Sequence, residues 1–305
     1  MTQAFLKTIV VCAVLLVIGP AVGAVAATLR AADGDPHVTL LTSSSPAFGA
    51  AMAVLIMAAA AASGWVGARL FHNGTGVTLA GLVVAWASWR TASAGELWSL
   101  PGASGRVWPV AVEGLILGLL AVVAVIRVES AGRWVFHAHD QAAPVTPVAR
   151  VGFVAHLRSS LVGVPALAAV GVGVLAGAAA AWLVAIEGTK GQGILAGLVA
   201  GLAAAAAGQL ASLSLDAKRE PTVAPALVAI TLLAVGGPIA AWLMLGDGLP
   251  QAARAVASGV GVKELLPLAR LTPLDWFGGA LIGAPIGLGW AGSMVEKRAA
   301  TPRTA

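Results

Sequence analysis

Polar side chains inside apolar stretches are the residues of this chain best able to do chemistry. Glu113 lies about one turn into one apolar run, Gln209 lies within another, and Arg90 stands near the end of a third. Charged groups are costly in a bilayer, so they usually line a cavity or pair with one another. We favour the interpretation that Glu113 is a carboxylate near the outer membrane interface. The alternative hypothesis is that Glu113, Gln209 and Arg90 line a polar cavity, with Arg90 or Arg106 as the cation facing Glu113.

Histidines offer a second kind of chemistry. His137, His139, Asp140 and His156 fall on one predicted loop and are ligand types that a divalent metal accepts. The spacing of the first two is common, however, and the surrounding loop is mostly Ala, Pro and Val. We therefore expect solvated interfacial histidines and predict no metal and no cofactor. Cys12, the only cysteine, cannot form an intramolecular disulfide.

One short string resembles a catalytic motif. Gly102-Ala103-Ser104-Gly105 is similar to the GxSG around the serine of rhomboid intramembrane proteases. The resemblance covers four residues, and the predicted later spans contain no histidine to act as the general base. We expect a turn there. HExxH, P-loop, CxxC and GxGxxG patterns are also absent, so an intramembrane enzyme is the least supported class.

Long apolar helices must position these side chains. Hydrophobic residues make up 59% of the chain and charged residues only 10%, whereas a soluble protein has roughly a quarter charged. A spanning helix needs about 20 mainly apolar residues, and backbone amides in hydrocarbon must bond within their own segment. The chain is predicted to be an all-α integral membrane protein with about eight transmembrane helices, forming a single transmembrane domain over residues 1–305. The spans are expected at 6–29, 47–70, 75–94, 107–127, 160–186, 191–215, 223–246 and 274–293. The third is the least secure because its apolar run is short.

The first span has two interpretations. Lys7, the apolar stretch, Pro20 and the small residues Ala24-Val25-Ala26 also describe a secretory signal peptide. We favour a retained helix because the apolar stretch is long enough to span a bilayer.

The distribution of Lys and Arg predicts the orientation. With the N-terminus inside, the inner segments hold eleven of these residues and the outer segments seven, and cytoplasmic loops carry the excess. Both termini are therefore predicted to be cytoplasmic. The richness in Ala, Gly and Val and the lack of tyrosine are typical of GC-rich bacteria, so we expect a bacterial inner membrane. The sparse cations at span ends suit anionic lipid and do not indicate nucleic acid.

Internal similarity suggests helical-hairpin repeats. Residues 165–184 resemble residues 225–244, and the spans that follow share a glycine period at Gly193, Gly197, Gly201 and at Gly279, Gly283, Gly287. A weaker similarity between residues 74–83 and 191–199 links helices of opposite direction, a pattern known from secondary transporters. Small residues at every fourth position let helix backbones approach closely.

Local signals locate several helix starts. Ser45-Pro46 and Thr272-Pro273 each combine an N-cap hydroxyl with a proline at the first helical position. Asp275 adds a carboxylate in the first turn, where the helix dipole favours it. In the central loop we expect an elbow helix near residues 148–158.

Three classes of function remain, and an intramembrane enzyme is the least supported of them. The number of spans, the repeats and the glycine-rich packing favour a permease or channel-like protein. The shortage of polar groups inside the membrane favours a structural or anchoring subunit of a larger membrane complex, without catalytic activity of its own. The expected partners are the lipid bilayer and either a second copy of the chain or other subunits of a membrane complex.

Overall fold

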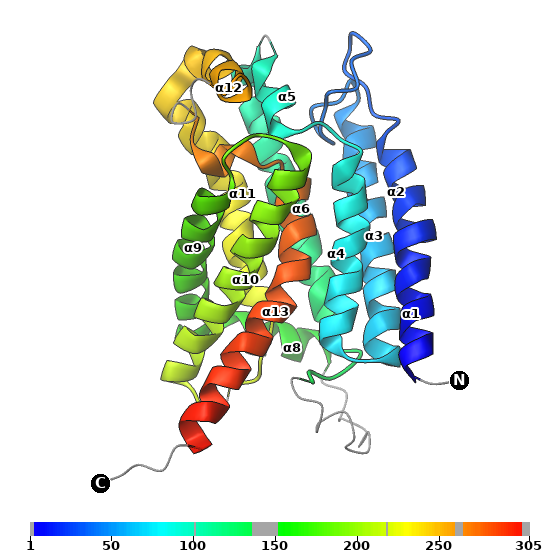
Figure 1. Cartoon of the computed structure of the whole chain (residues 1–305), viewed down its shortest axis with the longest axis vertical. Coiled ribbons are helices and arrows are strands. Elements are labelled where there is room, and N and C mark those ends of the chain that lie inside the picture. Colours follow the sequence, from blue (N-terminus) through cyan, green and yellow to red (C-terminus); the bar gives the residue numbers. More distant parts are fainter. Residues whose placement is uncertain (1–2, 101, 136–151, 218, 260–264, 301–305) are drawn as a thin grey trace.

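The computed structural model describes all residues except 1–2, 101, 136–151, 218, 260–264 and 301–305, and every regular element in the described part is a helix (Figure 1). Within that part, six helical segments are long and apolar enough to cross a membrane. They are Gln3–Ala26, Pro46–Leu70, Ala103–Glu129, Val164–Val184, Lys190–Leu215 and Ala224–Ala257. The chain is thus an all-α protein with the composition of a membrane protein, as the sequence predicted.

The predicted count of about eight spans is not confirmed. The predicted spans 75–94 and 274–293 correspond to α4 (Asn73–Trp89) and α13 (Pro273–Ala300), which also run between the two ends of the bundle (Figure 1). Helix α4 has only 17 residues, in line with the short apolar run noted there. Helix α13 is less apolar because glycines, two tryptophans and Pro285 occupy much of its length.

The first span is helical throughout. It consists of α1 (Gln3–Ala13), a π-helical turn η1 (Val14–Ile18) and α2 (Gly19–Ala26). Helix α2 packs along α4, and Gly19 makes this possible because a Cβ there would overlap the indole of Trp86. The segment therefore lies against the bundle, and its retention in the mature chain stays a prediction.

The remaining long helices form two layers. They are α3 (Pro46–Leu70), α6 (Val107–Glu129), α9 (Val164–Val184), α10 (Lys190–Leu215) and α11 (Ala224–Leu245), in addition to α4 and α13. One layer contains α4, α13 and α10, and the other contains α3, α6 and α11 (Figure 1). Helix α9 packs on α10 and α11 and closes that edge.

Helices α10 and α13 make the most extensive contact in the bundle. Their backbones touch: a Cβ on Gly201 would overlap Ala280, and a Cβ on Gly283 would overlap the carbonyl oxygen of Leu198. The close approach predicted from the glycine period is therefore confirmed for this pair. The internal repeats are not confirmed and stay a prediction.

The two ends of the bundle differ in build. The cap end carries residues 27–45, α5 (Ala94–Ser99), η2 (Ala103–Arg106), η3 (Gly246–Gly248), α12 (Leu249–Ala257) and η4 (Pro267–Arg270). These short pieces share a hydrophobic cluster around Leu97, Trp98 and Leu249. The base end carries the start of α1, α8 (Phe153–Leu161), residues 71–72, 216–217 and 219–223, and the end of α13 (Figure 1). Helix α8 matches the predicted elbow helix in place, although residues 148–151 lie outside the described part.

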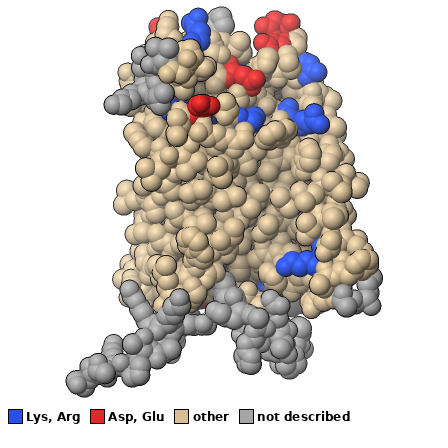
Figure 2. All heavy atoms as spheres, viewed as in Figure 1, with Lys and Arg blue, Asp and Glu red and all other residues tan. Residues whose placement is uncertain are grey.

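The outer surface of the long helices is apolar. Exposed side chains include Leu115 and Leu119 of α6 and Leu167 and Leu175 of α9. Figure 2 shows a broad middle band of one face without Lys, Arg, Asp or Glu, between charged groups at both ends. Such a band is what lipid-facing helices require.

Candidate functional site

Glu113, the leading candidate from the sequence, is buried beneath a loop segment at the cap end. Its side chain is 1% exposed. Oε2 accepts hydrogen bonds from Thr39 Oγ1 at 2.7 Å and from the Leu41 backbone N–H at 2.9 Å. Oε1 is buried and has no hydrogen-bond partner in the described part of the chain. One oxygen of this carboxylate therefore holds the segment in place, and the other is left unsatisfied.

The segment that Glu113 holds, residues 38–41, enters the end of the bundle. Leu40 is fully buried, and Gly49 of α3 lies so close to it that a Cβ there would overlap the Leu40 carbonyl oxygen. The carbonyl of Val38 accepts from the Ala92 N–H at 3.0 Å. Glu113 thus supplies polar partners for a stretch of backbone that has left regular structure, which buried backbone needs. We call residues 38–41 the strap.

Arg90 lies apart from Glu113. Its N–H closes the last turn of α4 on the carbonyl of Ala87, and its side chain is exposed beside Gly23 of α2. Among the described residues, no ion pair joins Glu113 to Arg90 or to Arg106. The expected cross-helix pairing is not found there.

Gln209 lies toward the base end of α10, whereas Glu113 lies toward the cap end of α6 (Figure 1). Gln209 is 8% exposed and lines a hollow of about 250 Å³ of empty space, counting the part open to solvent. The hollow lies among α9, α10 and α11 and is lined by Ala169, Ala204, Ala205, Gly208, Gln209, Ser212, Arg219, Thr222, Pro225 and Ala226. Glu113 and Arg90 are not in this lining. The structure therefore does not bring the three sequence candidates together, and a shared cavity stays a prediction.

A second buried carboxylate, Glu129, closes the base end of α6. Its Oε2 accepts from Thr222 Oγ1 at 2.8 Å and lies 3.1 Å from His156 Nε2, while Oε1 accepts from the Val223 N–H at 2.8 Å. Thr222 and Val223 lead into α11, so Glu129 satisfies amide and hydroxyl donors at that helix start. The carboxylate joins α6, α8 and α11.

The histidine in this cluster is the one candidate metal ligand that the structure describes. His156 lies on α8 beside Glu129, while His137, His139 and Asp140 lie outside the described residues. In the part of the chain that is described, no group of three His, Cys, Asp or Glu side chains is arranged to hold a metal ion. The hydrogen bond to Glu129 raises the pKa of His156, against the opposing effect of burial.

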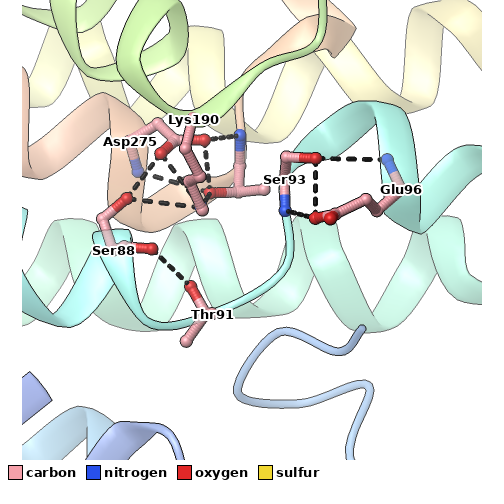
Figure 3. Close-up of polar contacts among 7 residues, drawn as sticks. Ser88, Thr91, Ser93, Glu96, Lys190 and Asp275 are labelled. Carbon is pink, nitrogen blue, oxygen red and sulfur yellow. Dashed lines mark hydrogen bonds and ion pairs between the residues drawn. The ribbon is translucent and has the colours of Figure 1, made fainter. Parts of the chain in front are cut away.

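A third cluster joins three helices at the cap end (Figure 3). Asp275 of α13 is 1% exposed, and its Oδ1 accepts from Lys190 Nζ at 3.1 Å and from Ser88 Oγ at 2.5 Å. Lys190 also donates to Thr272 Oγ1 at 3.2 Å and to Ser88 Oγ at 3.4 Å. All three ammonium protons thus have partners, and the cluster ties α4, α10 and α13 at one point.

The predicted caps account for part of this cluster. Asp275 Oδ2 accepts from the Thr272 backbone N–H at 2.9 Å, and the Asp275 N–H approaches Thr272 Oγ1 at 3.4 Å. The N-cap at Ser45 is also confirmed, because its hydroxyl accepts from the Phe48 N–H at 3.4 Å. Figure 3 shows a similar arrangement in α5, where Ser93 and Glu96 form a capping box. These carboxylates stabilise helix starts.

Sequence reasoning missed the ion pair and its neighbour Arg270. Arg270 is buried and donates to the carbonyls of Ala185, Ile186 and Leu265, which ties the end of α9 to the segment before α13. Burial lowers the pKa of Arg270. The available signal was a lone lysine next to a glycine-rich helix start, Lys190-Gly-x-Gly193. Gly193 is needed because a Cβ there would press on the Asp275 carboxylate.

The string Gly102-Ala103-Ser104-Gly105 begins with Gly102 in a left-handed conformation and continues into the single turn η2. The turn predicted there is confirmed. The chain matches no known family model, no curated protein and no solved structure. Its function must therefore be argued from the arrangement of its own residues.

Proposed function

We propose that this chain is a structural or anchoring subunit of a membrane complex. The observation that carries the proposal is the tightly packed interface between α10 and α13, where glycines bring the two backbones into direct contact. Between the Lys190–Asp275 cluster at the cap end and Gln209 near the base end, α10 presents Gly193, Gly197, Ala200, Gly201, Ala204 and Ala205 to its neighbours. A dissolved ion or polar solute needs polar groups along its path, and residues 193–208 of α10 supply none.

The use of the buried charges supports the same role. Glu113 holds the strap, Glu129 holds the start of α11 and α8, and Asp275 holds Lys190. Each of these carboxylates ties elements of this chain together near an end of the bundle. Such ties favour one fixed arrangement of helices, which suits a subunit that positions others.

The cap end is the surface on which we expect a partner protein to dock. It has its own small hydrophobic cluster and exposes both acidic and basic side chains (Figure 2). Mixed charge at an interface fixes orientation and partner choice more than affinity. The apolar outer faces of the long helices remain available to lipid.

Two measurements test the proposal. Purification from the native membrane in mild detergent is expected to retrieve a partner in fixed stoichiometry, with cross-links to residues of the cap end. Reconstituted liposomes are expected to pass ions and small solutes no faster than protein-free liposomes. Solute flux above that level, together with a chain that purifies without partners, would overturn the subunit role.

A permease is the second candidate, favoured by the polar hollow that Gln209 and Ser212 line. In this case flux in liposomes should exceed the protein-free level and should fall when Gln209→Leu closes the hollow. Gln192→Leu, outside the hollow on the same helix, is the matched control and should leave the flux unchanged.

We also propose that the base end faces the cytoplasm of a bacterial cell. The start of α1 and the end of α13 lie at that end (Figure 1), and it carries Arg69, Arg127 and Arg158. The cap end balances its cations with Asp33, Asp35, Glu96, Glu187 and Asp247. Alkaline phosphatase fused after residue 305 should be inactive and the green fluorescent protein fused there should fluoresce, and the reverse result would invert the orientation.

A further inference from the structure

The hollow near the base end contains a buried hydroxyl with nothing to bond. Ser212 is 1% exposed, and its Oγ has no partner in the described part of the chain. Gln209 contributes a carboxamide to the same lining, Arg219 and Thr222 form its polar rim, and the remaining walls are Ala, Gly and Pro. A buried polar group without a partner is costly unless water reaches it. The free space takes about one water molecule.

Helix α8 is bonded to the polar rim of this hollow. Arg219, which lines the hollow, donates to the carbonyls of Ser159 and Ser160 at 3.0 and 2.8 Å. Thr222, also in the lining, shares the Glu129 carboxylate with His156 of α8. Helix α8 further packs against α9 and α11, two of the three helices around the hollow.

We propose that the hollow is a site for water or a neutral hydrogen-bonding group of similar size, and that α8 is a gate held closed by the His156–Glu129 contact. The chemistry of the site follows from its lining: a hydroxyl and a carboxamide face the space, and the guanidinium of Arg219 is engaged by α8. The inference goes beyond the subunit role and does not depend on it.

The build of α8 suits an element that detaches. It has nine residues, too few for a helix to be stable alone. Its apolar stripe, Phe153, Leu157 and Leu161, packs against the main core while Val154 stays exposed. Gly163, with φ 101°, joins it to α9 in a conformation that other residues rarely adopt. The His156–Glu129 contact adds to the Arg219 hydrogen bonds and the apolar stripe, so its loss increases the share of chains in which α8 has turned about this glycine without disturbing α9.

The charges around His156 make the contact depend on pH. Glu129 of α6 faces it directly, and Glu220 before α11 adds a weaker attraction. The cations nearby are engaged elsewhere: Arg127 stacks on Phe153, and Arg219 bonds the α8 carbonyls. Arg158, on α8 itself, is exposed, and α9 brings no charged side chain. Since the pKa of His156 is raised, the contact is complete below its ordinary value of 6.5 and is lost as pH rises through the raised value.

Cysteine reactivity tests the gate directly. In a Cys12→Ala background, Ser212→Cys reports access to the hollow through its rate with a small charged methanethiosulfonate reagent. Ser214→Cys is the matched control, because it is exposed on the same helix. Between about pH 5.5 and about pH 8, the ratio of the two rates should rise on the order of tenfold, the usual worth of a charge-assisted hydrogen bond.

His156→Gln shows how much of the pH dependence of the labelling rate comes from opening of the gate and how much from ionisation of the thiol itself. Gln keeps a hydrogen-bond donor but does not titrate, so most of the rise in the ratio should disappear. A ratio that does not change with pH, or a rise that His156→Gln leaves intact, would overturn the proposal. A subunit role would survive either result, because its own tests are partner retrieval and flux.

Hydrogen exchange of the unsubstituted chain keeps the test valid if Ser212→Cys fails to fold. The α8 amides of the wild type should lose protection relative to His156→Gln as pH rises over the same range, after correction for intrinsic exchange. Amides in the middle of α9 serve as the internal control and should not change. Equal protection of α8 in the two chains at every pH would contradict the gate.

Discussion

Helix α6 carries a buried glutamate near each end, and the two carboxylates differ in their hydrogen bonds. Glu113 bonds through one oxygen to the strap and leaves its other oxygen unsatisfied. Glu129 uses both oxygens, on Thr222, Val223 and a histidine. Both residues are glutamates of the same helix, so the difference in their contacts comes from what the rest of the chain presents to them.

The difference shows how a carboxylate is accommodated at each place. Near the base end, the start of α11 offers N–H and hydroxyl donors in fixed positions, as helix starts do. Near the cap end, the strap offers two donors, and both bond to the same carboxylate oxygen. We therefore expect the Glu129 cluster to contribute more to stability than the Glu113 contact.

The largest effect is expected from Glu129→Ala. The substitution removes the hydrogen-bond acceptor of the Thr222 hydroxyl, the Val223 N–H and His156. It should therefore lower the free energy of unfolding by about 3–5 kcal/mol. Denaturant titration in mixed micelles, followed by tryptophan fluorescence, measures it. Glu129→Gln keeps one acceptor oxygen but turns an NH2 group toward the remaining donor, so it should cost less than Glu129→Ala without being neutral. A loss for Glu129→Ala no larger than that for Glu113→Ala would remove the proposed contrast between the ends.

Glu113→Ala should have a smaller effect, because only the Thr39 hydroxyl and the Leu41 N–H lose a partner. We expect a loss of about 1–3 kcal/mol in the same titration. Glu113→Gln should cost about 1 kcal/mol or less, since an amide oxygen still accepts both bonds. Equal losses for the two variants would show that the second oxygen has a partner that needs charge, as in the cavity hypothesis.

Much of the fold could be predicted from the sequence because its signals are local. Apolar runs predicted the helices, and hydroxyl–proline pairs predicted the starts of α3 and α13 at Ser45 and Thr272. The glycine period predicted close helix packing, and the structure shows that α10 and α13 are the helices that pack in this way. The order of helices within the two layers could not be predicted from the sequence. It depends on which apolar helix faces pack together, and the faces of helices made mostly of Ala and Gly are too similar to be distinguished.

The candidate site was predicted only in part. Glu113 and Gln209 interrupt apolar runs, which made them visible, and both are buried. Glu129 and Lys190 escaped notice because they stand at span ends, where a charge normally faces water. Their burial is created by α8 and by the start of α13, which return to these ends from elsewhere in the sequence.

The two histidines of the base end, His156 and His72, should have smaller effects on stability that depend on pH in opposite directions. The raised pKa of His156 means that its contribution is present below pH 6.5 and is lost as pH rises through the raised value. The stability difference between wild type and His156→Gln should therefore shrink from about 1 kcal/mol in mild acid to near zero in mild alkali. Thermal unfolding at a series of pH values measures it, and a difference that grows with pH would contradict the assignment.

The smallest effect is expected at His72, with the opposite sign. His72 is the N-cap of α4: its Nδ1 accepts from the Thr75 N–H at 3.2 Å, which requires an unprotonated nitrogen. Burial, and then the charge of Lys7, lower its pKa from 6.5. Its contribution is thus present above pH 6.5 and is lost as pH falls through the lowered value. His72→Asn keeps a good N-cap without a titrating group, so it should remove an acid-side loss of about 0.5–1 kcal/mol. Wild type and His72→Asn with parallel stability curves down to about pH 5 would show that the ring accepts no such bond.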